Sequence, residues 1–227
     1  MSGAVPVVAI DGPSGSGKGT VAREVALRLG WHLLDSGAIY RLLALASERL
    51  GIATDDESGL VETAHGSRME FRPRPEGDPL VLLDHQDVSG EIRTETCGDR
   101  ASQVAGYPAV RAALLQRQRD FRQPPGLVAD GRDMGTVVFP DAPVKIFLTA
   151  SVEERARRRY KQLKDQGAGV NLTDLSEEIA ARDRRDAERP VSPLVPAPDA
   201  IRLDTTGVTV DEVVERVLAL ARERVSG

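Results

Sequence analysis

Apolar residues gather in five short runs along the chain, each shorter than an ordinary helix. The runs lie at 5–10, 31–34, 127–129, 144–149 and 200–203. Most are continuous rather than alternating, which is typical of strands in a sheet that is covered on both faces. The pattern therefore predicts five buried strands of a parallel sheet.

Between these runs, apolar residues recur at helical spacing. They predict helices at 18–29, 38–50, 109–122, 152–166, 174–188 and 210–224. Thr209 and Glu212 have the spacing of a capping box at the start of the last helix. Ser151 and Glu154 have the same spacing ahead of the helix at 152–166. Strands that alternate with helices indicate an α/β fold with right-handed crossovers.

Residues 68–93 interrupt this alternation. Two apolar segments, 69–71 and 80–83, flank a turn-rich stretch at 73–79, and this arrangement predicts an antiparallel hairpin. We expect the hairpin to be an insertion on the α/β core and not a separate domain. Farther along, four prolines between 190 and 198 predict the end of a helix and a stiff connection.

A glycine-rich segment lies between the first strand and the first helix, where residues 12–20 read Gly-Pro-Ser-Gly-Ser-Gly-Lys-Gly-Thr. Glycines let successive backbone N–H groups converge on one anion, and the helix N-terminus adds positive potential. Lys18 can reach the β- and γ-phosphates of a nucleotide, and the Thr20 hydroxyl can face Mg²⁺. The segment predicts binding of a nucleoside triphosphate; a flexible linker is the alternative. Gly19 stands where the general motif has Ser or Thr, a variant that resembles nucleoside monophosphate kinases.

Composition is ordinary for a globular protein: 227 residues, 41% hydrophobic and 29% charged, fit one large domain or a domain with insertions. A net charge of −5 argues against a general affinity for nucleic acid, so the cations that bind polyphosphate must be concentrated locally. The single cysteine, Cys97, is expected to be buried and cannot form an internal disulfide. The run at 5–10 is too short to span a membrane and lacks the flanks of a signal peptide, so we expect a cytoplasmic protein.

Polar residues follow the second predicted strand at its carboxyl end, where ligands bind in open α/β sheets. Ser36, Tyr40 and Arg41 are therefore candidates for contact with a ligand near the phosphate loop. The alternative is a helix cap followed by a surface arginine.

The third predicted strand is followed by Asp130, Arg132 and Asp133. Asp130 has the position of a carboxylate that helps to hold Mg²⁺, directly or through water. Arg132 can grip a phosphate, and Asp133 can accept a hydrogen bond from an exocyclic amino group. A purely structural turn is the alternative.

Basic residues crowd the helix predicted at 152–166. They are Arg155, Arg157, Arg158, Arg159, Lys161 and Lys164. Like charges repel, so this density requires an anion or nearby carboxylates. With Gly167 and Gly169 as a hinge, the segment predicts a mobile lid that brings arginine to the transferring phosphoryl group and excludes water. A solvated basic helix is the alternative.

Three charged residues, Arg182, Asp186 and Arg189, share one face of the helix at 174–188. Taken alone, this spacing favours a ladder of surface ion pairs. Arg111, at the start of another helix, is ambiguous in isolation.

Long stretches of the chain resemble the bacterial cytidylate kinase family: the phosphate loop and residues 33–41, 87–93 and 130–140. The resemblance implies transfer of the γ-phosphoryl group of ATP to CMP or dCMP, with Mg²⁺, by a monomer. It also implies a P-loop α/β three-layer sandwich whose five-stranded parallel sheet has the order 2-3-1-4-5. The expected domain organisation is a single kinase domain, 1–227, with a core at 1–40 and 107–227, a nucleoside-monophosphate-binding insertion with the hairpin at 41–106, and a short helical lid at 153–170.

Site residues follow from the same resemblance. The ATP phosphates are assigned to Gly12, Pro13, Ser14, Gly15, Ser16, Gly17, Lys18, Gly19 and Thr20. The catalytic residues would be Lys18, Arg132, Arg157 and Arg158. The cytosine would contact Ser36, Arg111, Asp133 and Arg189, and the pentose would contact Ser102, Arg182 and Asp186. The acceptor phosphate would contact Arg41 and Arg132 with Arg93 nearby, and Tyr40 and Gly131 complete the CMP-binding set. Mg²⁺ would be held by Thr20 and Asp130.

Two alternatives to this function remain. One is a phosphate-loop kinase with another acceptor, such as AMP, UMP or a small alcohol. The other is a nucleotide sensor or a nucleic-acid-binding regulator, against which Lys18, the basic lid and an aromatic content of 4% argue. We expect ATP, CMP and dCMP as partners, and neither nucleic acid nor a membrane.

Overall fold

The computed structural model describes residues 4–72, 79–165, 169–189 and 191–225. Contacts divide the chain into two compact units. The first contains residues 1–35 and 119–227, and the second contains residues 36–118. This division places 36–40 and 107–118 together with the predicted insertion at 41–106, whose role stays a prediction.

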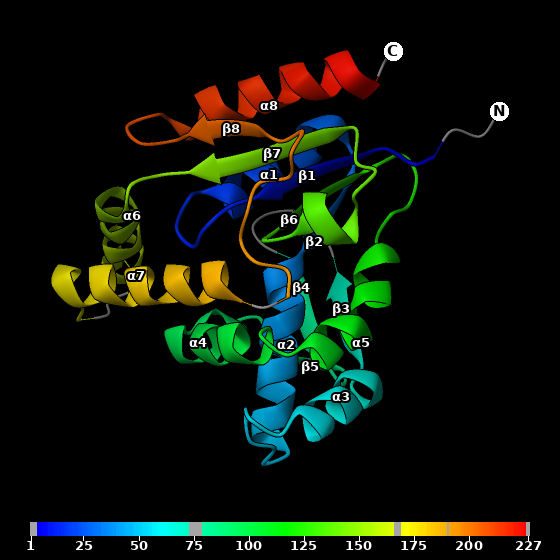
Figure 1. Cartoon of the computed structure of the whole chain (residues 1–227), viewed down its shortest axis with the longest axis vertical. Helices are drawn as coiled ribbons and strands as arrows, with labels where there is room; N and C mark the ends of the chain where they lie inside the picture. The colour runs from blue at the N-terminus through cyan, green and yellow to red at the C-terminus, as the bar shows by residue number, and fades with distance from the viewer. Residues whose placement is uncertain (1–3, 73–78, 166–168, 190, 226–227) are drawn as a thin grey trace. The chain divides into compact units, whose positions relative to one another are not determined.

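The first unit is built on a five-stranded parallel sheet (Figure 1). Its strands are β1 (Val7–Asp11), β2 (His32–Asp35), β6 (Leu127–Gly131), β7 (Val144–Thr149) and β8 (Ile201–Asp204). They lie in the order β2-β6-β1-β7-β8. Numbered among themselves along the chain, they have the order 2-3-1-4-5, so the predicted topology is confirmed.

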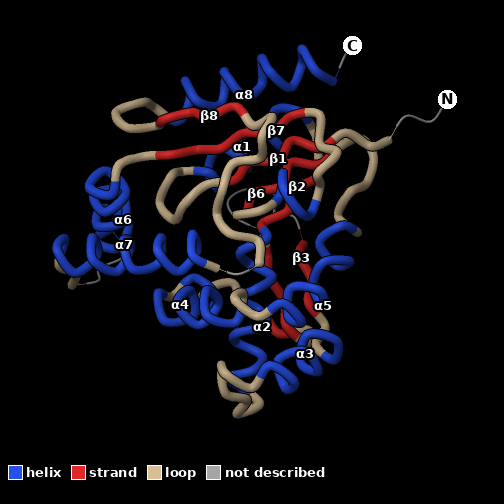
Figure 2. The backbone as a smooth tube through the Cα atoms, viewed as in Figure 1, coloured by secondary structure: helices blue, strands red, loops and turns tan. Residues whose placement is uncertain are grey.

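Helices complete this unit: α1 (Lys18–Leu29), α6 (Val152–Asp165), α7 (Leu172–Glu188) and α8 (Val210–Val225). Val8 and Ile10 of the central strand share one hydrophobic core with α1 and α8, while Val7 and Ala9, on the other face, are also fully buried. Both faces of β1 are therefore covered, as the continuous apolar run predicted. Figure 2 shows the two helices, α6 and α7, that connect β7 to β8.

The predicted capping box of α8 is confirmed, because Thr209 and Glu212 each accept a hydrogen bond from the other's backbone N–H. At α6 only half of the box forms. Ser151 Oγ accepts from the N–H of Glu154, whereas the Glu154 carboxylate pairs with Arg158.

The second unit contains the predicted hairpin, in which β3 (Met69–Arg72) pairs antiparallel with β4 (Leu80–Leu83). Its turn at 73–78 lies outside the described residues. A third strand, β5 (Gln86–Asp87), was not predicted. The unit's helices are α2 (Ser36–Arg49), α3 (Glu57–Gly66), the short η1 (Glu91–Arg93), α4 (Glu95–Val104) and α5 (Pro108–Arg119). Cys97 is buried in its core, as expected.

Several elements of the structure have no counterpart among the predictions. Besides β5, these are α3, η1, α4 and a π-helical turn, η2 (Met134–Val138). The predicted hinge residue Gly167 and the proline at 190 lie outside the described residues. In the described ranges, no helix has the length and apolar character needed to cross a membrane.

Candidate functional site

The glycine-rich loop joins the central strand β1 to α1, as predicted. A Cβ on Gly12 would lie 2.3 Å from the Leu148 carbonyl oxygen, so only glycine fits there. Gly17 precedes α1 in a left-handed conformation, with φ of 88° and no side-chain cap among the described residues. The first N–H groups of α1 therefore stay available to an anion.

Lys18 opens α1, and its Nζ donates a hydrogen bond to the Pro13 carbonyl oxygen at 3.3 Å. Burial, and then the charge of Arg132, lower the pKa of Lys18, while Asp130 acts against them. Asp130 lies at the end of β6, and burial followed by the charge of Asp35 raises its pKa. The negative charge of a polyphosphate would favour the charged ammonium form of Lys18.

Asp11, which sequence reasoning missed, anchors the turn that follows β6. Its carboxylate accepts hydrogen bonds from the N–H groups of Met134 and Gly135, both at 2.8 Å. Burial raises the pKa of Asp11 to about 6. The contact holds Arg132 and Asp133 beside the end of β1, where the glycine-rich loop begins. A carboxylate at the end of an apolar strand was the one available signal.

Arg132 contacts the helix α7 through Asp186, with 2.8 Å between Nε and Oδ2. The expected surface ladder is wrong, because Asp186 is only 3% exposed and Arg189 is also buried. Burial by itself would raise the pKa of Asp186, but Arg132, then Arg189 and Arg182, lower it below its usual value. The first unit thus gathers five of the predicted CMP-binding side chains: Arg132, Asp133, Arg182, Asp186 and Arg189. Gly131, where a Cβ would lie 2.8 Å from Met134 Cε, belongs to the same turn.

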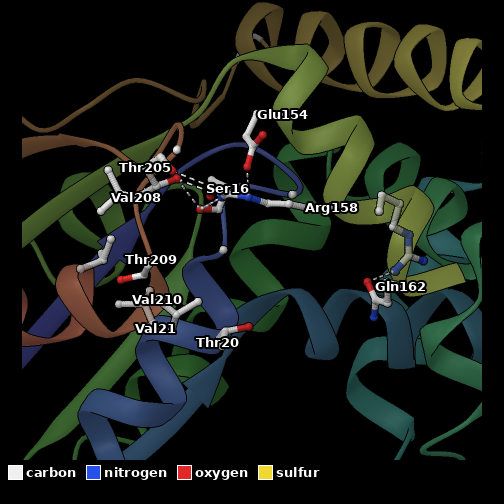
Figure 3. Close-up of a pocket in the computed structure, with 15 residues that line it drawn as sticks. Ser16, Thr20, Val21, Glu154, Arg158, Gln162, Thr205, Val208, Thr209 and Val210 are labelled. Atoms are coloured by element: carbon white, nitrogen blue, oxygen red, sulfur yellow. Dashed lines mark hydrogen bonds and ion pairs between the residues drawn. The ribbon is translucent and has the colours of Figure 1, made fainter. Parts of the chain in front are cut away.

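A cavity of about 630 Å³ adjoins the glycine-rich loop (Figure 3). It is lined by the loop, by the start of α1, by α6 and by the segment 205–210 that follows β8. Valines 21, 208, 210 and 213 make it partly apolar. Within the described part of the chain, Ser16 Oγ is buried and has no hydrogen-bond partner. Sequence reasoning missed the segment 205–210, although its place at the carboxyl end of a parallel strand could have indicated it.

The two predicted lid arginines have different surroundings. Arg158 lines the cavity, and its guanidinium donates to Glu154 Oε1 at 3.0 Å and to the Thr205 carbonyl oxygen at 2.6 Å. Figure 3 shows Arg158 between Glu154 and the segment that contains Thr205. Arg157 is exposed and does not line this cavity, whereas Arg159 does.

The second unit holds the remaining predicted CMP-binding residues. Arg41 donates from Nη1 to the carbonyl oxygens of Ile92 and Thr94, at 2.6 and 3.1 Å. The Arg111 guanidinium lies 5.4 Å from the centre of the Tyr40 ring, which is a cation–π contact.

Three further predicted residues of this unit differ in burial. Ser36 is buried and donates to Gln118 Oε1 at 2.7 Å. Ser102 is buried on α4. Arg93 is exposed and donates from Nε to the Ser89 carbonyl oxygen.

A parallel sheet of this order, with a glycine-rich loop and lysine after its central strand, is typical of P-loop nucleotide-binding proteins. The cytidylate kinase family model matches residues 8–223. A cytidylate kinase of Stutzerimonas stutzeri is 58% identical over 97% of this chain and 96% of its own length. One of Methylococcus capsulatus is 56% identical over 98% and 99%, and one of Pectobacterium carotovorum is 58% identical over 98% and 99%. The chain belongs to the cytidylate kinase family.

Proposed function

We propose which residues of this cytidylate kinase family member bind the two nucleotides and which catalyse the transfer. The chain transfers the γ-phosphoryl group of ATP to CMP or dCMP, and ADP and CDP or dCDP are the products. The observation that supports a catalytic role most directly is the loop 12–17, whose helix end and Lys18 suit a polyphosphate.

ATP is bound, in this proposal, by the loop and by the cavity beside it. The phosphates accept hydrogen bonds from backbone N–H groups of residues 12 and 14–20, and the charge of Lys18 attracts them. The buried hydroxyl of Ser16 is available as a further donor. The base and ribose occupy the cavity, whose valines suit an aromatic ring and whose rim carries Arg158 and Arg159.

CMP is bound, in this proposal, by the residues that the family resemblance implies. Asp133, which is 3% exposed, accepts a hydrogen bond from the cytosine amino group, and Ser36, Arg111 and Arg189 contact other atoms of the base. Ser102, Arg182 and Asp186 bind the pentose. Arg41 and Arg132 bind the acceptor phosphate, with Arg93 close to it.

Mg²⁺ fits the oxygen donors that Thr20 and Asp130 supply. A carboxylate and a hydroxyl suit a small hard cation, which usually takes one or two protein ligands and several phosphate oxygens. A Cβ placed on Gly19, next to Thr20, would lie 4.0 Å from Asp130 Oδ2, so this carboxylate approaches the start of α1. The bound cation would neutralise charge on the β- and γ-phosphates.

The residues of the chain position the reactants and neutralise charge, and none needs to act as a nucleophile. An oxygen of the CMP phosphate attacks the γ-phosphorus, while Lys18, Arg132 and the lid arginines stabilise the charge of the transferring group. We further propose a monomer in the cytoplasm that has no nucleic-acid partner.

The function is tested by incubating the chain with ATP, Mg²⁺ and CMP and separating the nucleotides by chromatography. We expect equal amounts of ADP and CDP, and no ADP above background without CMP. Binding of ATP with no CDP formed would instead indicate a nucleotide sensor.

A further inference from the structure

Arg155 lies in the first turn of α6, and its side chain is only 4% exposed. The guanidinium makes four hydrogen bonds to three segments of the chain. Nε donates to the Ala150 carbonyl oxygen at 3.0 Å, and Nη1 donates to the Ser14 carbonyl oxygen at 3.0 Å. Nη1 and Nη2 also pair with the two carboxylate oxygens of Asp183 on α7, at 3.0 and 2.5 Å.

The contact with Ser14 reaches the phosphate loop itself. When the N–H groups of such a loop converge on an anion, carbonyl oxygens must point the other way and find donors there. Arg155 supplies that donor for Ser14. Gly15 is next in the chain, with φ of 77°, and a Cβ there would lie 3.0 Å from Arg155 Cβ. The backbone of α6 therefore packs directly on the loop.

The carbonyl oxygen of Ser16, two residues after Ser14, also accepts a hydrogen bond from a side chain of α6. Arg158 Nη1 donates to the Ser16 carbonyl oxygen at 3.4 Å, and Thr205 Oγ1 lies 3.2 Å from that oxygen. Two alternate carbonyl groups of the loop are thus turned toward arginines that lie three residues apart on α6. One turn of this helix therefore contacts residues 14–16 of the loop.

We propose that Arg155, oriented by Asp183, is a positioning residue that holds the phosphate loop ready for the phosphates of ATP. This proposal rests on the proposed function of the loop. When the Ser14 carbonyl is held away from the phosphate site, the N–H groups of the loop face that site before the nucleotide binds. Less conformational entropy is then lost on binding. A planar guanidinium can bind the carboxylate with two parallel bonds and still reach the carbonyl, which an ammonium group cannot do.

The test uses Arg155→Lys, which keeps the charge, and Asp183→Asn, which keeps the shape of the orienting side chain. The matched control is Arg122→Lys. Arg122 also joins a carboxylate, Asp141, to a backbone carbonyl, but that carbonyl belongs to Val5, before β1 begins. All three variants weaken an arginine–aspartate contact, and only two of them affect the phosphate loop.

We expect Arg155→Lys and Asp183→Asn to raise the Kd for ADP, measured by calorimetry, on the order of tenfold. The Kd for CMP should change less than about twofold. Deuterium exchange of the backbone amides in a peptide that spans residues 12–17 should become faster without nucleotide. Arg122→Lys should leave all three quantities as in the unchanged chain.

Equal losses of ADP and CMP affinity, or unchanged exchange in the loop, would overturn the proposal, because the ion pair would then serve only the fold. Failure of both variants to fold leads to the same conclusion. ADP binding and deuterium exchange need no turnover. A chain that makes no CDP would therefore contradict the proposed function while these measurements still decide the role of Arg155.

Discussion

Lys18 and Asp130 show how a buried charge cluster can be arranged for a polyanionic ligand. Burial, and then the charge of Arg132, lower the pKa of Lys18, while burial, and then the charge of Asp35, raise the pKa of Asp130. Phosphate and Mg²⁺ would bring the opposite charges that both side chains require. The role of Lys18 could be predicted from the sequence, because the phosphate-loop motif consists of residues that are neighbours in the chain.

Replacing Lys18 by Ala should lower kcat by roughly 10²–10³, in line with the loss of one donor to transition-state charge. Steady-state kinetics with saturating ATP and CMP measure the effect, and a thermal melt checks that the variant is folded. Near-normal turnover in a folded variant would contradict the role of Lys18.

Replacing Asp133 by Ala should shrink the ratio of kcat/KM for CMP over UMP. A carboxylate only accepts hydrogen bonds, so it suits the amino group of cytosine and repels the carbonyl oxygen that uracil has there. Asp133→Asn is the matched variant: its amide can donate to that oxygen, and we expect it to favour UMP further. A ratio that is unchanged in both variants rules out Asp133 as the discriminating residue.

The surroundings of other site residues are set by contacts with distant segments of the chain, which the spacing of residues in the sequence does not reveal. Asp186 and Arg189 looked like a surface ladder because helical spacing describes only one element. Arg132, 54 residues away in the chain, pairs with Asp186. Of the three residues in the presumed ladder, Asp186 and Arg189 are buried and Arg182 is half-buried. Asp11 was missed for the same reason, since its partners are backbone N–H groups of another segment.

At the scale of elements, α8 was predicted to within one residue and α4 was missed. The apolar stripe and capping box of α8 are both continuous in sequence. In α4, Gly98 has a low helix propensity, and the buried face consists mainly of small side chains, among them Cys97, Ala101 and Ser102, which do not stand out as apolar in the sequence. Weak helical patterns are overridden by tertiary contacts, which a sequence alone does not display.

Gly98 in α4 leads to a prediction for the acceptor site. A Cβ at this position would lie 2.6 Å from Arg41 Nη2, so the guanidinium would have to move. Gly98→Ala should therefore raise the KM for CMP about tenfold, as expected for losing a hydrogen bond to a charged group. The KM for ATP should stay the same.

The control is Gly66→Ala, at the end of α3, where a Cβ meets nothing within 4 Å among the described residues. It should leave both KM values unchanged. A KM for CMP that is unaffected by Gly98→Ala would exclude Arg41 from the binding of the acceptor phosphate.

For the molecule as a whole, the order of the strands, which the structure confirms, could be predicted only through the family resemblance. The alternation alone gives a parallel sheet and not the order of its strands. The boundary between the two units was less accessible to sequence reasoning. Residues 36–118 form one unit, although α2 continues directly from β2 without a linker.

Asp11 should make the stability of the folded chain depend on pH. Its folded-state pKa of about 6 lies above the ordinary value of 3.8, so the folded state binds this proton more tightly. The stability from this group is present below about pH 4 and is lost as the pH rises through about 6. Relative to Asp11→Asn, the chain should lose about 2 kcal/mol of unfolding free energy between these limits, because each pKa unit corresponds to about 1.4 kcal/mol and the titration is incomplete at both ends.

Urea unfolding of both proteins between pH 4 and pH 7 measures this difference. The asparagine variant lacks the titrating group, so pH-dependent groups that do not interact with Asp11 cancel in the comparison. A difference that stays constant, or that grows in favour of Asp11 as the pH rises, would show that Asp11 is not held as a buried acid.

The preferred acceptor nucleotide is the most direct measure of whether this chain is built to phosphorylate CMP. The measurement is kcat/KM for CMP, dCMP, UMP and AMP with the unchanged chain, at saturating ATP and Mg²⁺ in one ADP-release assay. We predict efficient turnover of CMP and dCMP, with UMP and AMP much poorer. AMP or UMP as the preferred acceptor would contradict the account.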